Sequence, residues 1–186
     1  MAKKYFLFDC ETGGLDPSYS LLTLFGGVLD SNFNVIETID LAIKPSSGKY
    51  IVHPMAMKTN KIDLVQHDAM AVTEKEAAGK LHSFLCRHTH AGRLIPAGHN
   101  VRLDLNFAEV LLPQFEQYVL HRAHDTASIA SLAQNLGILS EGCSLSLPKI
   151  CEELGIDSTG LHNAQIDFEL TRQVMIQLEQ RIKNRV

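Results

Sequence analysis

Apolar positions along this chain follow two different periods. From Tyr5 to Phe8 every side chain is apolar, so both faces of an extended chain are hydrophobic, and this predicts a covered central strand over Tyr5–Thr12. Alternating patterns predict two more strands over Leu21–Ser31 and Val35–Pro45, which complete an antiparallel meander of three. Two further strands are expected over Leu94–Ala97 and Val119–His124. The pattern predicts a mixed sheet.

Most of the remaining chain shows helical periodicity or residues that cap helices. Thr73 with Glu76 forms a capping box, and apolar residues follow it at helical spacing. A short helix is expected to begin near Pro54, and another is expected from about Arg102 to Pro113, with Leu103, Phe107, Val110 and Leu111 on its buried face. Three more helices are expected: one from Asp125 through Ala133, one from Pro148 to Gly155, and one from about His162 to Arg181. The expected fold class is α/β, with helices flanking the sheet.

Two acidic residues lie where the central strand should end. Asp9 and Glu11 are two residues apart, so they share one face of the strand and emerge just before Gly13-Gly14. Neighbouring buried carboxylates repel each other unless a cation neutralises them, and hard divalent metals prefer oxygen ligands. The alternative is that both acids simply face water at a strand end, which is the commoner case for an isolated pair of this kind.

Two more carboxylates occur on predicted helices, close to their apolar faces. Asp104 lies beside the face of Phe107 and Leu111, and Asp167 lies at the edge of a stripe that includes Leu170 and Val174. On an ideal helix His162 would point about 140° away from Asp167, so we expect it on the loop that enters the helix. Four acids close to the core indicate a site for two metal ions that performs phosphoryl transfer.

Composition and charge limit the classes to which this protein can belong. With 186 residues, of which 45% are hydrophobic, residues 1–186 suit a single domain with its own core. The start of the chain does not resemble a signal peptide, no stretch is long enough to span a membrane, and the four cysteines lack C-x-x-C spacing. We therefore expect a cytoplasmic protein with reduced cysteines and no membrane partner. The net charge of −4 argues against a broad basic surface that grips long duplexes.

Three stretches of the sequence resemble one known family. They are Phe8-Asp9-Cys10-Glu11-Thr12-Gly13-Gly14-Leu15, then Gly98-His99-Asn100 through Asp104 to Phe107, and then His162-x-Ala164-x-x-Asp167-x-x-x-Thr171. Together they resemble the DEDD 3′-to-5′ exonucleases, which include polymerase proofreading subunits, oligoribonuclease and ribonuclease T. This resemblance implies a ribonuclease H-like fold. Histidine five residues before the final aspartate is similar to the histidine subtype.

The resemblance also implies roles for individual residues. Asp9, Glu11, Asp104 and Asp167 would be catalytic and would hold two divalent metal ions, Mg²⁺ or Mn²⁺, with His162 as general base. The residues expected to contact the terminal nucleotide are Thr12, Gly13, Leu15, His99, Asn100 and Phe107. For Leu15 and Phe107, packing in the core is an equal alternative.

The activity that this resemblance implies is 3′-to-5′ exonuclease activity, which releases nucleoside 5′-monophosphates from single-stranded or frayed 3′ ends. DNA is slightly favoured over RNA, and the protein would act alone, as a homodimer or with a polymerase. Leu103 replaces an aromatic residue and Gly13 replaces a threonine that are common in the family, which leaves substrate preference open. Alternatives are a nuclease of other polarity and a non-catalytic module that binds nucleic-acid ends. The module is disfavoured because binding alone does not require carboxylates that repel phosphates.

Overall fold

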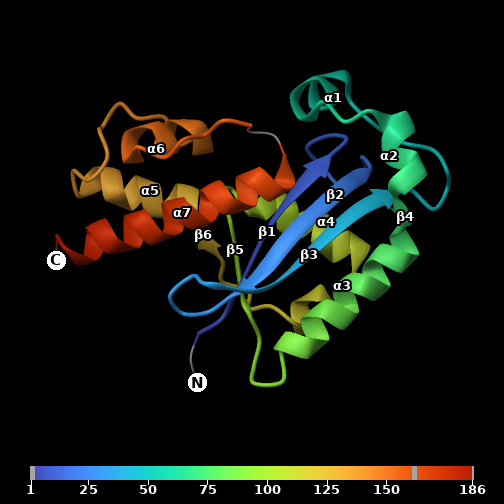
Figure 1. Cartoon of the computed structure of the whole chain (residues 1–186), viewed down its shortest axis with the longest axis horizontal. Coiled ribbons are helices and arrows are strands. Elements are labelled where there is room, and N and C mark those ends of the chain that lie inside the picture. Colours follow the sequence, from blue (N-terminus) through green and yellow to red (C-terminus); the bar gives the residue numbers. More distant parts are fainter. Residues whose placement is uncertain (1–2, 161–162, 186) are drawn as a thin grey trace.

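A computed structural model describes residues 3–160 and 163–185 and contains a six-stranded mixed sheet (Figure 1). The strands are β1 (Tyr5–Thr12), β2 (Leu21–Leu29), β3 (Val35–Lys44), β4 (Val72–Thr73), β5 (Ile95–Gly98) and β6 (His124–Asp125). Their order across the sheet is β4-β3-β2-β1-β5-β6. This order makes β1 a central strand, as the apolar pattern predicts.

The meander of β1, β2 and β3 is antiparallel, whereas β5 pairs parallel to β1. The predicted α/β mixed sheet is therefore confirmed. Its sixth strand, β4, pairs with only Ile43 and Lys44 of β3 and was not expected. The predicted strand over Val119–His124 is wrong in extent, because only an isolated bridge joins Val119 to Leu94 and β6 begins at His124.

Seven α-helices are found in the described part of the chain. They are α1 (Pro54–Asn60), α2 (Leu64–Met70), α3 (Glu74–His88), α4 (Arg102–Leu111), α5 (Thr126–Asn135), α6 (Leu147–Leu154) and α7 (Ala164–Lys183), with a short 3₁₀ turn, η1 (Phe115–Gln117). The capping box of Thr73 and Glu76 is present at the start of α3. Gly155 ends α6 with a positive φ of 74°, a conformation that costs glycine little.

Helices cover both faces of the sheet (Figure 1). On one face, Phe6 and Phe8 of β1 pack with Leu81 and Phe84 of α3 and with Phe107 of α4. On the other face, a second cluster joins side chains of β1 and β2 to α7, and it contains Tyr5, Leu7, Phe25, Phe168 and Met175. A third cluster joins α5 and α6 to the same helix, α7. The side chains of β1 are thus fixed from both sides.

Two details of the predicted helices need correction. Val110 was expected on the buried face of α4, but 63% of its surface is exposed because the apolar stripe passes through Phe107, Ala108 and Leu111 instead. The last helix begins at Ala164, not His162, because the Asn163 side chain caps it by accepting from the backbone of Gln165 and Ile166.

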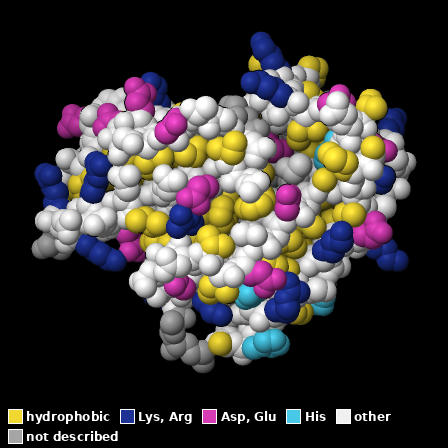
Figure 2. Space-filling model, in the orientation of Figure 1, with side chains coloured by type: hydrophobic (Ala, Val, Ile, Leu, Met, Phe, Trp, Pro, Cys, Tyr) yellow, Lys and Arg dark blue, Asp and Glu magenta, His cyan; other side chains and the backbone are white. Residues whose placement is uncertain are grey.

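The surface carries no concentrated basic area on the face in Figure 2, where acidic and basic side chains are interspersed. All four cysteines are free, and Cys10 and Cys151 are buried, as the sequence predicts. Within the described residues, none of the helices is both long and apolar enough to cross a bilayer.

Candidate active site

Three of the four predicted acids meet at the C-terminal end of β1. Asp9 and Glu11 share the face of β1 that packs against α7, and Asp167 lies in the first turn of α7. Each offers a carboxylate oxygen, and the three oxygens lie within 4.8 Å of one another. The contact between α7 and β1 thus brings together residues more than 150 positions apart in the sequence.

The fourth acid, Asp104, reaches β1 from the opposite helix layer. Its Oδ1 accepts a hydrogen bond of 2.9 Å from the backbone N–H of Cys10, which lies between Asp9 and Glu11. The β5 partner of β1 ends after the pair Leu7–Ala97, so the edge of β1 beyond that pair is open to a side chain. The Asp104 side chain reaches the backbone of β1 at this open edge, and only 5% of its surface is exposed.

Gly98 allows α4 to start close to β1. A Cβ atom at this position would lie 2.8 Å from a methyl group of Val101 and 3.2 Å from the carbonyl oxygen of Phe8. A side chain there would push the start of α4 away, and Asp104 with it. The glycine of the second family-like stretch is therefore explained by close approach.

Electrostatics in this cluster favour protonated carboxyl groups when no cation is bound. Burial and the charges of Asp104, Asp167 and Glu11 raise the pKa of Asp9 well above its ordinary value. Burial, and then the charge of Asp167, raises the pKa of Glu11 to about 7. Burial raises the pKa of Asp104 to about 7, although hydrogen bonds from Cys10 and from its own backbone oppose the rise.

A divalent cation fits this set of residues. Asp9, Glu11 and Asp104 take part in no ion pair with a Lys, Arg or His of the described chain. Carboxylate oxygens are the ligands that Mg²⁺ and Mn²⁺ prefer, and a bound cation offsets the repulsion that raises their pKa values. Residues Asp9, Glu11 and Asp167 fit one such ion.

The predicted general base, His162, lies outside the described residues. The described chain resumes at Asn163, which caps α7, and Asp167 follows one turn later. The role of His162 therefore stays a prediction.

A pocket of about 470 Å³ opens beside the acids. Its lining includes Glu11 and Thr12 from β1, Leu15, Tyr19, Leu103 from α4, and His53, Met55, Thr59 and Asn60 from or next to α1. Leu15 is 84% exposed at this pocket, so the alternative that it packs in the core is wrong. The volume lies within the range of roughly 300–1,000 Å³ usual for small-ligand sites.

The other predicted nucleotide contacts are dispersed. Thr12 is buried and lines this pocket, whereas the backbone N–H of Gly13 already donates to the carbonyl oxygen of Ser20 at 2.7 Å. The imidazole of His99 is 2.8 Å from the hydroxyl of Thr126, and Asn100 is exposed, with its backbone N–H held by Asp125. Neither His99 nor Asn100 is among the described residues that line the pocket.

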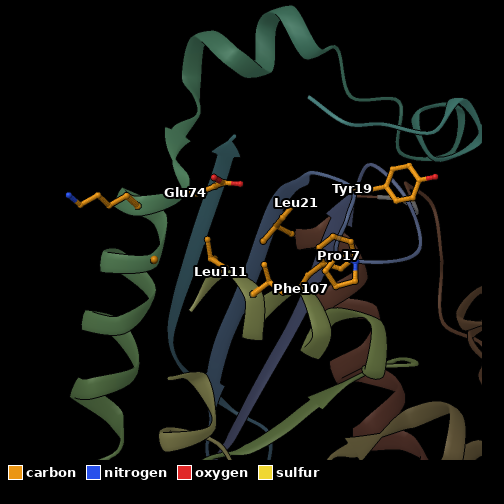
Figure 3. A pocket seen from close by; sticks show the side chains of 9 residues that line it. Pro17, Tyr19, Leu21, Glu74, Phe107 and Leu111 are labelled. Atoms are coloured by element: carbon orange, nitrogen blue, oxygen red, sulfur yellow. The ribbon is translucent and has the colours of Figure 1, made fainter. Parts of the chain in front are cut away.

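Phe107 belongs to the core, with 2% of its surface exposed. It also forms the floor of a smaller pocket of about 240 Å³, where Pro17 and Leu21 lie close to it and Glu74 lies at the far side of the opening (Figure 3). Tyr19 lines both pockets. The smaller pocket contains none of the four clustered acids, so it is separate from the metal site.

No pattern in the sequence indicates the part of the site that α1 builds. The segment from Ile51 to Asn60 folds over the turn after β1, and Figure 1 shows α1 above the end of that strand. A Cβ atom on Gly13 would lie 2.5 Å from the carbonyl oxygen of Ile51, so glycine is what permits this contact. The Gly13-Gly14 pair was the available clue, because it marks a turn that another segment can approach closely.

Comparison with known proteins identifies the family. A family model described as "Exonuclease" matches residues 6–175, which includes β1, α4 and Asp167. The chain belongs to this exonuclease family. The resemblance found in the three sequence stretches is therefore confirmed at the level of the family, and the carboxylate cluster lies within the matched region.

Solved exonuclease I structures have the same fold as this exonuclease domain. The zinc-bound form of the E. coli exonuclease I complex with single-stranded DNA superposes with a TM-score of 0.80 at 20% identity, and covers 100% of this chain and 42% of that protein. Exonuclease I from Methylocaldum szegediense gives a TM-score of 0.80 at 21% identity, over 98% of this chain and 42% of that protein. These similarities confirm the expected fold.

A curated relative is larger still. The PolC-type DNA polymerase III of Oceanobacillus iheyensis is 26% identical over 179 residues, which is 96% of this chain but 12% of that polymerase. The chain thus spans less than half of the two exonuclease I proteins and about an eighth of the polymerase.

Proposed function

We propose that this protein is a metal-dependent 3′-to-5′ exonuclease that releases nucleoside 5′-monophosphates from single-stranded or frayed ends. The observation that carries this proposal is the cluster of Asp9, Glu11 and Asp167 within 4.8 Å, with Asp104 hydrogen-bonded to the residue between the first two. Membership of the exonuclease family supports the reaction class. The E. coli relative that binds single-stranded DNA supports the substrate class, with DNA slightly favoured over RNA.

The roles proposed for the chain's own groups are those that the family resemblance implies. Asp9, Glu11 and Asp167 would hold one Mg²⁺ or Mn²⁺ ion, and Asp9 with Asp104 would hold the second. When bound, two such ions stabilise the charge that develops on the attacking and leaving oxygens of a phosphodiester. His162 would accept the proton of the attacking water, because an imidazole has a pKa close to neutral.

The pocket next to Glu11 would receive the terminal nucleotide. Leu15 is an exposed apolar side chain at the pocket edge, so it is suited to wedge against the terminal base. Thr12 and Tyr19 line the same pocket. Its lining combines polar side chains with apolar ones such as Leu15, Met55 and Leu103, and these apolar and aromatic surfaces favour contact with an unpaired base without reading its sequence.

The expected setting of the protein is also part of this proposal. We place residues 1–186 in one domain and the protein in the cytoplasm. The PolC-type relative supports a polymerase as partner, and a homodimer is the other arrangement expected from the sequence.

A degradation assay tests the proposal. Single-stranded DNA, single-stranded RNA and a mismatched duplex, each labelled at the 5′ end, should yield ladders that shorten from the 3′ end, and 3′-labelled strands should release labelled mononucleotide at once. Asp9→Asn should be inactive under the same conditions. Release of mononucleotides from the 5′ end would establish the other polarity, and tight binding without degradation would establish the end-binding module.

A further inference from the structure

The turn that follows β1 is held by α1 through one buried amide side chain. Asn60, the last residue of α1, donates from Nδ2 to the carbonyl oxygen of Thr12 at 3.2 Å. Its Oδ1 accepts from the backbone N–H of Ile62 at 3.1 Å. Only 8% of the Asn60 surface is exposed, so both ends of the amide are used in an enclosed position. A side chain without both a donor and an acceptor cannot make this pair of contacts.

Other hydrogen bonds between these segments come mainly from the backbone. The N–H of His53 donates to the carbonyl oxygen of Gly13 at 2.6 Å, and Ser20 N–H donates to the carbonyl oxygen of Ile51 at 2.9 Å. The Ser20 hydroxyl accepts from the N–H of Ile51 at 2.9 Å. These three bonds hold the start of the segment that includes α1, whereas Asn60 holds its end.

This arrangement places Asn60 in the lining of the pocket and bonds it to the residue that follows Glu11. Thr12 follows Glu11 directly, and Asn60 lines the pocket together with Met55 and Thr59 of the same helix. Since α1 and β1 both contribute residues to the pocket lining, the bond from Asn60 to Thr12 links the two elements at the pocket. Loss of the bond would let the wall move while the carboxylates keep their own contacts through α4 and α7.

We propose that Asn60 is a positioning residue, which fixes α1 at the separation from β1 that grips the terminal nucleotide. This assignment rests on the proposed function and adds to it a residue outside the three family-like stretches. Asn60 acts through Thr12 and α1, so its loss should weaken nucleotide binding much more than it slows the chemical step.

The test compares three variants with the wild-type protein. Asn60→Ala removes both hydrogen bonds, whereas Asn60→Asp keeps the size of the side chain and the acceptor for Ile62 but loses the donor to Thr12. His67→Ala is the matched control, because His67 is also a buried helix side chain, 5% exposed, whose Nε2 lies 2.8 Å from a strand carbonyl oxygen, that of Ile43. The contact of His67 lies on α2 and β3, and His67 is not among the residues that line the pocket.

The measurements are KM and kcat on single-stranded DNA, the Kd of thymidine 5′-monophosphate by calorimetry, and the melting temperature. Both Asn60 variants should raise KM and Kd about tenfold, the upper end for one lost hydrogen bond, and change kcat less than about threefold. His67→Ala should lower the melting temperature about as much as the Asn60 variants do, but it should leave KM and Kd unchanged.

Several results would overturn the assignment. Wild-type KM and Kd in Asn60→Asp would show that the donor to Thr12 is not needed, and equal weakening in His67→Ala would reduce Asn60 to a general stability role. A wild-type protein that degrades single strands alongside an unaffected Asn60 variant removes this inference alone. A wild-type protein that neither binds the nucleotide nor degrades single strands removes the proposed function as well.

Discussion

Glu11, near the end of β1, and Glu37, near the start of β3, are glutamates of the same sheet in opposite settings. The carboxylate of Glu37 accepts from Arg87 at 2.5 Å and lies 2.7 Å from the imidazole of His88, both on α3. These partners lower the pKa of Glu37, whereas burial and Asp167 raise the pKa of Glu11 to about 7. Glu37 has the Arg87 guanidinium and the His88 imidazole beside it, and Glu11 has carboxylates as neighbours.

The difference between the two regions indicates what each is for. An acid whose charge is matched by the chain itself contributes to holding α3 against β3. Asp9, Glu11 and Asp104, which pair with no Lys or Arg of the described residues, make the metal-free fold less stable, and such an arrangement is expected where an ion completes the site. The contrast therefore separates acids that are paired within the fold from those that would serve the reaction under the proposed function.

The largest effect is expected from His162, the proposed general base. His162→Asn should lower kcat by roughly 10² to 10⁴, as expected for loss of a general base. The variant should keep the metal-dependent rise in melting temperature, because the four carboxylates are unchanged. Measured between pH 6 and 8, a variant rate equal to that of the wild type would exclude His162 from the mechanism.

Glu11→Gln tests the repulsion directly. It removes one charge while keeping the side-chain shape, so the metal-free variant should melt at a higher temperature than the wild type. Mn²⁺ at about 100 times its Kd should stabilise the wild type by about 2.7 kcal/mol, a rise of roughly 5 to 10 °C for a chain of this length. The variant should lose most of this rise and lose activity by at least roughly 10²-fold.

Calorimetry with chelator, Mg²⁺ and Mn²⁺ would measure both effects. A wild-type melting temperature that does not respond to either metal would contradict the two-metal arrangement, and the four acids would then have ordinary structural roles.

Local sequence patterns were sufficient where structure depends on nearby residues. The central strand, the capping box at Thr73 and the left-handed Gly155 follow from short-range chemistry, and all three are present. The inward positions of Asp104 and Asp167 follow from helical periodicity, and both are buried. Each of these features can be predicted from a window of about one helical turn.

Long-range packing decided what the sequence did not predict. Strand β4 has two residues and exists only because it pairs with the end of β3. In the sequence, Asn60 is an ordinary polar residue at a helix end. Its partner, the carbonyl oxygen of Thr12, lies 48 positions away in the chain. Val110 comes three residues after Phe107, yet it is exposed beside the apolar stripe of α4 that packs in the core. Contacts of this kind leave no local pattern.

The contribution to stability should change with pH in opposite directions at Glu11 and at Glu37, because folding raises the pKa of Glu11 and lowers that of Glu37. Because folding raises the pKa of Glu11 and Asp104 to about 7, the folded state retains their protons at pH values where the unfolded chain has lost them. Their contribution to stability is full below the unfolded values near 4 and is lost as the pH rises through about 7. Without metal, the protein should therefore melt at a higher temperature at pH 5.5 than at pH 8.

Saturating Mg²⁺ should reverse this trend, because the ion binds the ionised carboxylates. Glu11→Gln should flatten the metal-free profile. A metal-free melting temperature that rises steadily from pH 5.5 to pH 8 would mean that the acids at the end of β1 are not repelling one another.

The smallest effect is expected at the other end of the comparison. Glu37→Gln removes an acid of the same type as Glu11 from the same sheet, but here the charge is paired with Arg87 and His88 at a partly exposed position. Exposed ion pairs contribute about 0–1 kcal/mol, so the melting temperature should fall by no more than roughly 4 °C. The loss should shrink in 1 M salt, where charges are screened over about 3 Å. Exonuclease activity and the Mn²⁺-dependent rise should match the wild type, and a loss of either would mean that the β3 region also supports the reaction.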